Sequence, residues 1–426
     1  MIKTIQLPAK RFITTTARRG HPVLELTFPR RIRDSACKDS LEKPISTSSS
    51  NTESTFGDIR STGAISTGKI PTSVKETAKP ERNIITIPKP DGTTLLGRIG
   101  QHHVSVTGLI PKYCEVRYYY DLIFDVRYES KMLERGTRIH EVLERQQNQK
   151  IEDVLRIIET LPTKVVNRDR VFESIVKILE LVRNGSVREL YLQGIIPYGD
   201  GEKVLVSGII DKLHLDKNGE VVITDTKTRA SKTAVPTQES IQNAKFQTFI
   251  YRQMLDNLVL GKFSHETWNA HHGDFDLDSV DFTTELGSAV KKQLEDTLIM
   301  MAHNKARVNK LTHMESLRKK YADAWSIASF QSLLSDLYRM IVPTVSTQTE
   351  VEFMYQNARN DEIRTISHHQ FTFDRTLMNE VVEFSMEFWD YRRPPLGVQS
   401  SQYARCTNCH WKNQCEWKFK LDHNLL

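Results

Sequence analysis

The sequence predicts an α/β fold, because a β-hairpin lies between two long segments of helical pattern. Residues 203–229 hold two β-rich runs on either side of Lys217–Gly219, a turn sequence typical of hairpins. Residues 131–149 and 238–259 lie on the two sides of this hairpin and contain few helix breakers, as helices do. We therefore expect a mixed central sheet flanked by helices.

Length and composition indicate a soluble globular protein of one large domain or two ordinary ones. The chain has 426 residues, of which 38% are hydrophobic and 26% are charged. No apolar run approaches the roughly 18 residues that a membrane helix needs, so we expect no membrane association. Five cysteines are too few for a disulfide scaffold in a chain of this size.

Residues 1–33 have the composition of a mitochondrial transit peptide. They contain eight basic residues and one acid, and they lack a secretory apolar core; a disordered basic tail is the alternative. The rest of the chain has 51 basic against 52 acidic residues, so the net charge of +6 comes from residues 1–33 and the remaining chain is close to neutral. The Ser/Thr-rich residues 34–94 predict a disordered linker, which leaves 95–426 as the folded domain.

The loop length of the hairpin decides which side chains face each other. Side chains alternate along a strand, so Asp225 and Lys227 share one face of the second strand. A two-residue loop would point Asp211 away from Asp225. A three-residue loop with a left-handed Gly219 puts Asp211 opposite Asp225, with about 5 Å between the Cβ atoms, close enough to share a divalent cation. The alternative is an edge hairpin with an ordinary Asp225–Lys227 ion pair.

The flanking helical segments each carry polar side chains that suit a site. In residues 131–149, Gly136 precedes His140 by four positions, and His140 borders an apolar stripe. In residues 238–259, Gln247 and Tyr251 share one helix face. Simple packing is the alternative for each of these side chains.

The four motifs in this order, Gly-x-x-x-His, Gly-Ile-Ile-Asp, Asp-Thr-Lys and Gln-x-x-x-Tyr, resemble the PD-(D/E)XK nuclease superfamily and its RecB-like branch. The resemblance implies a restriction-endonuclease-like core in which His140, Asp211 and Asp225 bind the metal. It also implies that Lys227 aids the attacking water, and that Gln247 and Tyr251 position the DNA strand. The chain departs from the nominal Pro-Asp of the superfamily, because Ile210 precedes Asp211.

Oxygen and imidazole ligands favour Mg²⁺ or Mn²⁺ over a closed structural zinc site. Such a cation polarises the scissile phosphate and lowers the pKa of bound water, and Lys227 would stabilise the developing charge. Glu141, Glu144 and Glu189 are candidates for a further acid, and the sequence does not rank them.

Three cysteines near the C-terminus, Cys406, Cys409 and Cys415, predict a metal centre. Cys-x-x-Cys-His is formally a haem attachment motif. A zinc site would use the three thiolates with His410, His423 or Cys114. A 4Fe–4S cluster needs a fourth thiolate, and Cys114 is the one that lies outside the disordered tail.

One cysteine ahead of the Gly-x-x-x-His helix and three after the core resemble the iron–sulfur nucleases of the RecB-like branch, and most of all the exonuclease V family. The resemblance covers residues 95–426. It implies a 4Fe–4S cluster on Cys114, Cys406, Cys409 and Cys415 that joins the two ends of the domain, with zinc as the alternative. It also implies a single-strand DNA exonuclease located in mitochondria or nuclei.

The remaining chain predicts a helical insertion at about 260–395. Its helix 299–321 carries basic residues that would line a groove for the strand, or simply a solvated face. Alternation in 351–355 and in 364–373 predicts a strand and its hairpin partner, and a helix from 375 ends before Pro394.

The sequence therefore predicts a monomeric, metal-dependent exonuclease that hydrolyses single-stranded DNA from a free end in mitochondrial DNA maintenance or repair. A RecB-like endonuclease or flap nuclease, and a catalytically silent single-strand-binding protein, are the alternatives. RNA is a further possible substrate, although no motif reads a 2′-hydroxyl. The phosphate-binding loop of ATP-driven helicases is missing from the sequence.

Overall fold

The computed structural model describes residues 84–425, apart from 129–130, 148–151, 161–165, 230, 232, 234, 265–283, 303–307, 324–325, 343 and 357–361. The expected transit peptide (1–33) and most of the expected linker lie outside the described residues. None of the described helices is both long enough and apolar enough to cross a membrane.

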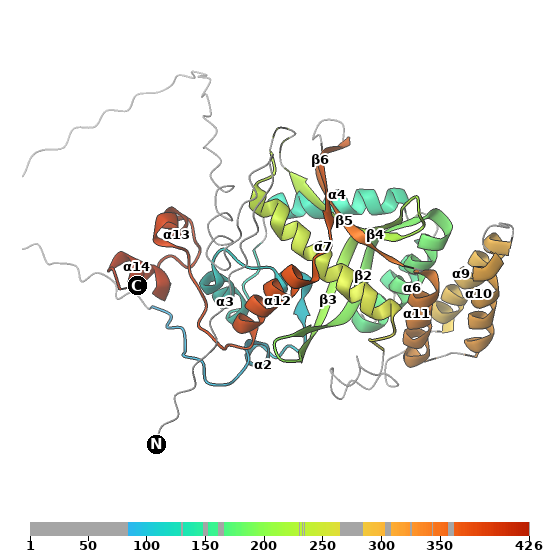
Figure 1. Ribbon diagram of the computed structural model, residues 1–426, viewed down its shortest axis with the longest axis horizontal. Coiled ribbons are helices and arrows are strands. Elements are labelled where there is room, and N and C mark those ends of the chain that lie inside the picture. Colours follow the sequence, from blue (N-terminus) through green and yellow to red (C-terminus); the bar gives the residue numbers. More distant parts are fainter. Residues whose placement is uncertain are drawn as a thin grey trace, which may run out of the picture.

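A mixed sheet forms the centre of the fold, as the sequence predicts (Figure 1). Its strand order is β1-β3-β4-β5-β6. Strands β1 and β4 pair with different stretches of one edge of β3, and β2 pairs along its other edge. The β2/β3, β3/β4 and β5/β6 pairs are antiparallel, whereas β1/β3 and β4/β5 are parallel. The strands are β1 (Val104–Ser105), β2 (Ser186–Tyr198), β3 (Glu202–Leu215), β4 (Val221–Arg229), β5 (Val345–Gln356) and β6 (Ile363–Thr372).

Helices surround this sheet. The described ones are α2 (Leu95–Arg98), α3 (Glu115–Ile123), α4 (Lys131–Gln147), α5 (Glu152–Thr160), α6 (Val166–Asn184), α7 (Gln238–Val259), α9 (Thr284–Ala302), α10 (Val308–Lys320), α11 (Ile327–Ile341), α12 (Arg375–Trp389), α13 (Ala404–Thr407) and α14 (Glu416–Asp422), with short 3₁₀ turns at Val106–Leu109 and Ser400–Gln402. Both helices expected beside the hairpin are present as α4 and α7.

The strand predicted at 351–355 and its hairpin partner at 364–373 are present as β5 and β6. Both extend the central sheet, so within residues 260–395 the helical part ahead of them ends with α11. The helix expected over 299–321 is divided between α9 and α10. Of the basic side chains there, Arg318, Lys319 and Lys320 form the last turn of α10, and the others lie outside the described side chains.

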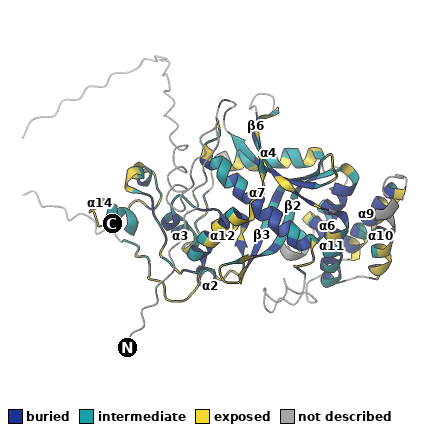
Figure 2. Cartoon of the chain, in the orientation of Figure 1, coloured by how far each residue is buried: buried dark blue, intermediate teal, exposed yellow. Residues whose placement is uncertain are grey.

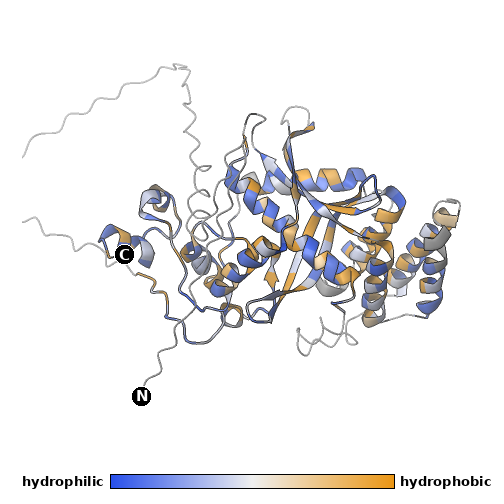
Figure 3. Cartoon of the chain, in the orientation of Figure 1, coloured by the Kyte–Doolittle hydropathy of each residue, from blue (hydrophilic) through white to orange (hydrophobic). Residues whose placement is uncertain are grey.

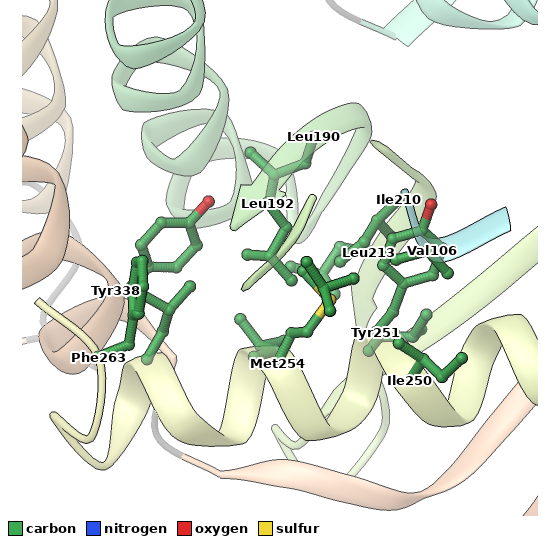
Figure 4. Packing of buried hydrophobic residues seen from close by; sticks show 14 of the residues in the cluster. Val106, Leu190, Leu192, Ile210, Leu213, Ile250, Tyr251, Met254, Phe263 and Tyr338 are labelled. Atoms are coloured by element: carbon green, nitrogen blue, oxygen red, sulfur yellow. The ribbon is translucent and has the colours of Figure 1, made fainter. Parts of the chain in front are cut away.

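Helix α7 packs closely against β2 and β3 and forms much of the core. Figure 4 shows Met254 and Tyr251 of α7 beside Leu192 and Ile210 of the strands. Glycine permits this approach, because a Cβ atom at Gly194 would lie 3.0 Å from Met254. Buried residues concentrate in α7 and the central strands (Figure 2), whereas α10 is mostly polar (Figure 3). This packing holds in place β2, which carries Glu189, and β3, which carries Asp211.

The two ends of the described chain are held together beside α3. The Ile85 amide donates a hydrogen bond to the Gln414 carbonyl (2.8 Å), and the Tyr120 hydroxyl donates to the Ile85 carbonyl (2.9 Å). The indole of Trp411 donates to Asp121 (2.7 Å). Ile85 belongs to the stretch that we expected to be linker, so the ordered chain begins before Leu95.

Candidate active site

Three neighbouring strands each place an acid at the same level of the sheet. The pairs Arg188–Lys212 and Leu190–Ile210 put Glu189 of β2 opposite Asp211 of β3. Extending the register of the Lys212–Thr224 pair by one residue puts Asp211 opposite Asp225 of β4. The hairpin has the three-residue loop: Asp216 and Glu220 close it with a 2.9 Å hydrogen bond, and Gly219 has a φ of +79°.

Glu189 has an unusual backbone conformation, with a φ of +54°. A left-handed non-glycine residue costs ~1–3 kcal/mol, and such residues cluster at functional sites.

Helix α4 brings His140 to these acids. Gly136 permits the approach of α4 to β4, since a Cβ atom there would lie 3.2 Å from the Thr228 hydroxyl. His140 Nδ1 lies 2.8 Å from Glu189 Oε1, and one ligand atom from each of His140, Glu189 and Asp211 lies within 4.8 Å of the others. The structure thereby separates the three acid candidates. Glu141 is exposed, Glu144 binds Lys177 at 2.8 Å, and Glu189 joins His140 and Asp211.

Lys227 lies between Asp225 and helix α7. Its Nζ donates to Asp225 Oδ1 (3.0 Å) and to Gln247 Oε1 (2.6 Å). Gln247 is 8% exposed and Tyr251 is 6% exposed. A Cβ atom at Gly208 would lie 2.7 Å from the Tyr251 hydroxyl, so this ring packs against β3. That Gln247 and Tyr251 position the DNA, as the resemblance implies, stays a prediction; in this structure Gln247 accepts a hydrogen bond from Lys227, and the Tyr251 ring packs against β3.

The carboxylates of the site are crowded in a poorly solvated place. Burial raises the pKa of Asp225 to about 6; Lys227 opposes this shift and Asp211 adds to it. Burial also raises the pKa of Asp211, against the charges of Lys227 and His140. Burial disfavours the charged form of His140, but the Glu189 hydrogen bond and the Asp211 charge leave its pKa raised overall. A divalent cation would relieve the repulsion between these acids.

A second group of possible ligands, Glu350, Glu352 and His368, lies on β5 and β6. Each of its two carboxylates has a neighbour within the protein. Glu350 accepts hydrogen bonds from Thr224 (3.1 Å) and Gln370 (3.1 Å), and Lys212 lies 3.7 Å from Glu352. We assign this group to the structure of the sheet.

The four predicted cysteines converge from both ends of the fold. Cys114 and Cys415 cap the N-termini of α3 and α14, and each sulfur accepts an amide hydrogen bond at 3.5 Å. Burial raises the pKa of Cys114 to about 12, and the other three thiols add to the shift. Burial raises that of Cys406 to about 11, again with its cysteine neighbours contributing. Positive helix N-termini and a bound metal favour thiolates at such positions.

The two histidines considered as zinc ligands contact neighbouring protein groups. The His423 ring lies 2.7 Å from the Phe419 carbonyl, and His410 packs edge-on against Tyr128 and Trp411. Sequence reasoning did not identify Lys177, a buried lysine of α6 whose ammonium lies 2.7 Å from the Glu189 carbonyl.

The family model described as "Exonuclease V - a 5' deoxyribonuclease" matches residues 97–220 and 214–418. Exonuclease V of Danio rerio is 22% identical to the chain over 75% of this chain and 72% of its own length. Mitochondrial exonuclease V of Eremothecium gossypii is 24% identical (78% and 80% covered), and that of Vanderwaltozyma polyspora is 21% identical (75% and 74% covered). The solved crystal structure of SSO0001 aligns over 76% of this chain and 94% of its own at 12% identity, but its TM-score of 0.29 is too low to support an argument.

Proposed function

The chain belongs to the exonuclease V family, a family of DNA exonucleases, and on this premise we propose that it hydrolyses single-stranded DNA from a free end with the help of Mg²⁺ or Mn²⁺. One observation carries this proposal: His140 of α4, Glu189 of β2 and Asp211 of β3 each offer a ligand atom within 4.8 Å of the others, and Asp225 follows on β4 beside Lys227. The description of the family model leads us to expect attack from the 5′ end.

The residues present fit a hard divalent cation. Carboxylate oxygens and one imidazole are ligands that Mg²⁺ and Mn²⁺ accept, and the raised pKa of Asp225 indicates negative charge that the protein alone does not fully balance. Asp211 and Asp225 would hold the ion, with His140 and Glu189 completing the set. When bound, the ion supplies polarisation of the phosphate and a water of lowered pKa.

The other residues of the site orient charge. Asp225 and Gln247 fix the ammonium of Lys227, so its positive charge is held in place before the charge of the phosphoryl group develops. The amide of Thr226 donates to Asp211 Oδ2 (2.6 Å), which fixes this carboxylate toward β4. Glu189 holds the His140 ring through Nδ1, as carboxylates do for metal-binding histidines.

Three substrates distinguish the proposal from its alternatives. We expect the anaerobically purified protein with Mg²⁺ to degrade linear single-stranded DNA and to leave circular single-stranded DNA and linear RNA intact, and we expect Asp225→Ala to abolish the activity. Cleavage of circles would instead identify an endonuclease. DNA binding without cleavage, in protein that carries its metal centre, would identify a silent binding protein. A 5′-labelled strand that releases its label first would establish 5′ polarity.

The proposal includes a 4Fe–4S cluster on Cys114, Cys406, Cys409 and Cys415. A single tetrahedral zinc with Zn–S bonds of ~2.3 Å needs sulfur atoms about 3.8 Å apart. Among the described residues, no three cysteine sulfurs lie within 4.8 Å of one another. A cluster spreads its thiolates over several metal atoms, and it would close a loop of about 290 residues between Cys114 and Cys406. Iron, sulfide and zinc analysis of anaerobic protein, with a visible spectrum, decides between the two metals.

We place this activity in the mitochondrion, with the nucleus as the alternative. Two of the relatives are named mitochondrial, and residues 1–33 are basic with a single acid. Import of a fluorescent protein fused to residues 1–33 would support this location, and nuclear accumulation of the full chain would contradict it. Light scattering tests the proposed monomer.

A further inference from the structure

Lys177 of helix α6 is a fully buried lysine whose three donors all have partners. Its Nζ lies 2.6 Å from Glu173 Oε1, 2.8 Å from Glu144 Oε1 and 2.7 Å from the backbone carbonyl of Glu189. An ammonium has three hydrogens to donate. Charged lysines are almost never buried unless paired, so these contacts fix Lys177 in place.

The three partners come from three different elements. Glu173 is one turn away on α6, Glu144 belongs to α4, and Glu189 belongs to β2. Glu144 lies one helical turn after His140, so both occupy the same face of α4. The position of α4 that presents His140 is therefore tied to Lys177.

The contact with Glu189 falls on the one strand residue with a left-handed backbone at the site. Strand β2 is an edge strand, and its outward carbonyls require partners from other elements. Ser174 donates to the Tyr191 carbonyl (3.3 Å), and Lys177 donates to the Glu189 carbonyl two residues earlier. The charged ammonium of Lys177 gives a stronger hydrogen bond than the Ser174 hydroxyl. Its acceptor is the carbonyl of Glu189, whose φ of +54° turns the side chain toward His140.

These contacts form a closed ring: Lys177 binds Glu144, the helix α4 connects Glu144 to His140, His140 binds Glu189, and the Glu189 backbone returns to Lys177. We propose that Lys177 is a positioning residue that holds Glu189 and His140 in the geometry of the cation site. This inference rests on the proposed function, because it assumes that a divalent cation binds beside Asp211. Lys177 itself touches neither DNA nor the ion.

The test measures Mn²⁺ binding to the full-length, cluster-loaded protein without DNA, by calorimetry or by the loss of the free-ion EPR signal. Lys177→Met should weaken Mn²⁺ binding about 10- to 100-fold, as loss of an outer partner of a metal site does. The Mg²⁺ concentration for half-maximal activity should rise by the same factor, with a smaller change in kcat at saturating Mg²⁺. Lys177→Arg should retain most of the affinity.

Arg183→Met provides the matched control. Arg183 is a buried cation of the same helix whose partners, Glu180 (2.6 Å) and Gln293 (2.7 Å), belong to α6 and α9 and not to α4 or β2. Both variants remove a buried cation and lower thermal stability, but the control should bind Mn²⁺ as wild type does. A loss of affinity in Lys177→Met alone separates positioning from a general effect on stability.

Each outcome decides between failure of the inference and failure of the proposed function. Unchanged Mn²⁺ affinity in folded Lys177→Met, with wild-type binding lost in Asp211→Asn, overturns the inference and leaves the function standing. Wild-type protein that binds no Mn²⁺, or binds it equally in Asp211→Asn, overturns both. If Lys177→Met does not fold, Glu144→Ala serves, because Glu144 is partly exposed. It should lower the affinity several-fold, and unchanged affinity there overturns the inference.

Discussion

The Asp225 carboxylate should lower the free energy of unfolding of the metal-free protein, although the proposed DNA hydrolysis depends on it. The carboxylate is 4% exposed and lies opposite Asp211, and burial raises its pKa to about 6. Asparagine has nearly the same shape and carries no charge. We therefore expect Asp225→Asn to abolish DNA hydrolysis and, in the absence of divalent cations, to increase the free energy of unfolding.

The size and the pH range of this effect follow from the pKa. An aspartate of pKa about 3.9 in the unfolded chain and about 6 in the folded chain makes the ionised form about 3 kcal/mol less favourable in the folded protein. Below about pH 4 the carboxyl is protonated in both states, so the penalty is zero. It grows from pH 4 to pH 6 and is complete above that. The pKa of about 6 already includes the attraction of Lys227, so about 3 kcal/mol is the net effect.

Urea denaturation in EDTA at pH 5 and pH 7.5 measures the effect. The variant should exceed wild type by up to about 3 kcal/mol at pH 7.5 and by less at pH 5. Addition of Mg²⁺ should stabilise wild type more than the variant, since ligand binding to the folded state adds stability. A variant that is less stable than wild type at pH 7.5 in EDTA, or a difference that does not change with pH, would refute the reasoning.

Three further predictions concern other contacts. Gln247→Leu removes one of the two acceptors that orient Lys227, and should lower kcat about tenfold with little change in KM for DNA, measured by steady-state kinetics; an unchanged kcat would exclude this role. Glu115→Gln disrupts the buried bidentate pair with Arg393 (2.5 and 2.8 Å) and should cost about 3 kcal/mol in urea denaturation, whereas a cost below about 1 kcal/mol would show that the pair contributes little. Cys409→Ser should lower the iron content and increase proteolysis of the C-terminal segment, and full iron content with wild-type resistance would remove Cys409 from the cluster.

The part of the site that depends on local pattern could be predicted from the sequence. Strand alternation with a glycine at the left-handed loop position placed Asp211 opposite Asp225, and the structure has this arrangement. The spacing of Gln247 and Tyr251 placed both on one helix face, and α7 spans them. These features depend on interactions over a few residues, for which sequence pattern is informative.

The remaining features of the site depend on tertiary contacts that pattern does not encode. The sequence did not rank Glu189 above Glu141 and Glu144 as the further acid. In the structure, the left-handed backbone of β2 at Glu189 directs its side chain toward His140. Lys177 lies within a nearly all-buried helix, where a lysine in the sequence gives no sign that three partners from three elements surround it. Ile85, which belongs to the segment predicted as linker, pairs with the distant Cys415, and local pattern does not encode such a contact.

The most direct test of the account is the rate of DNA hydrolysis by Asp211→Asn beside wild type, at saturating Mg²⁺ on linear single-stranded DNA. Asp211 lies between Glu189 and Asp225 and belongs to the group with His140, so the ion would depend on it more than on any other side chain. Loss of even an outer partner of a metal site costs about 10- to 100-fold, and we expect the loss here to exceed 100-fold. Hydrolysis by folded Asp211→Asn within a few-fold of wild type would contradict the assignment of this site.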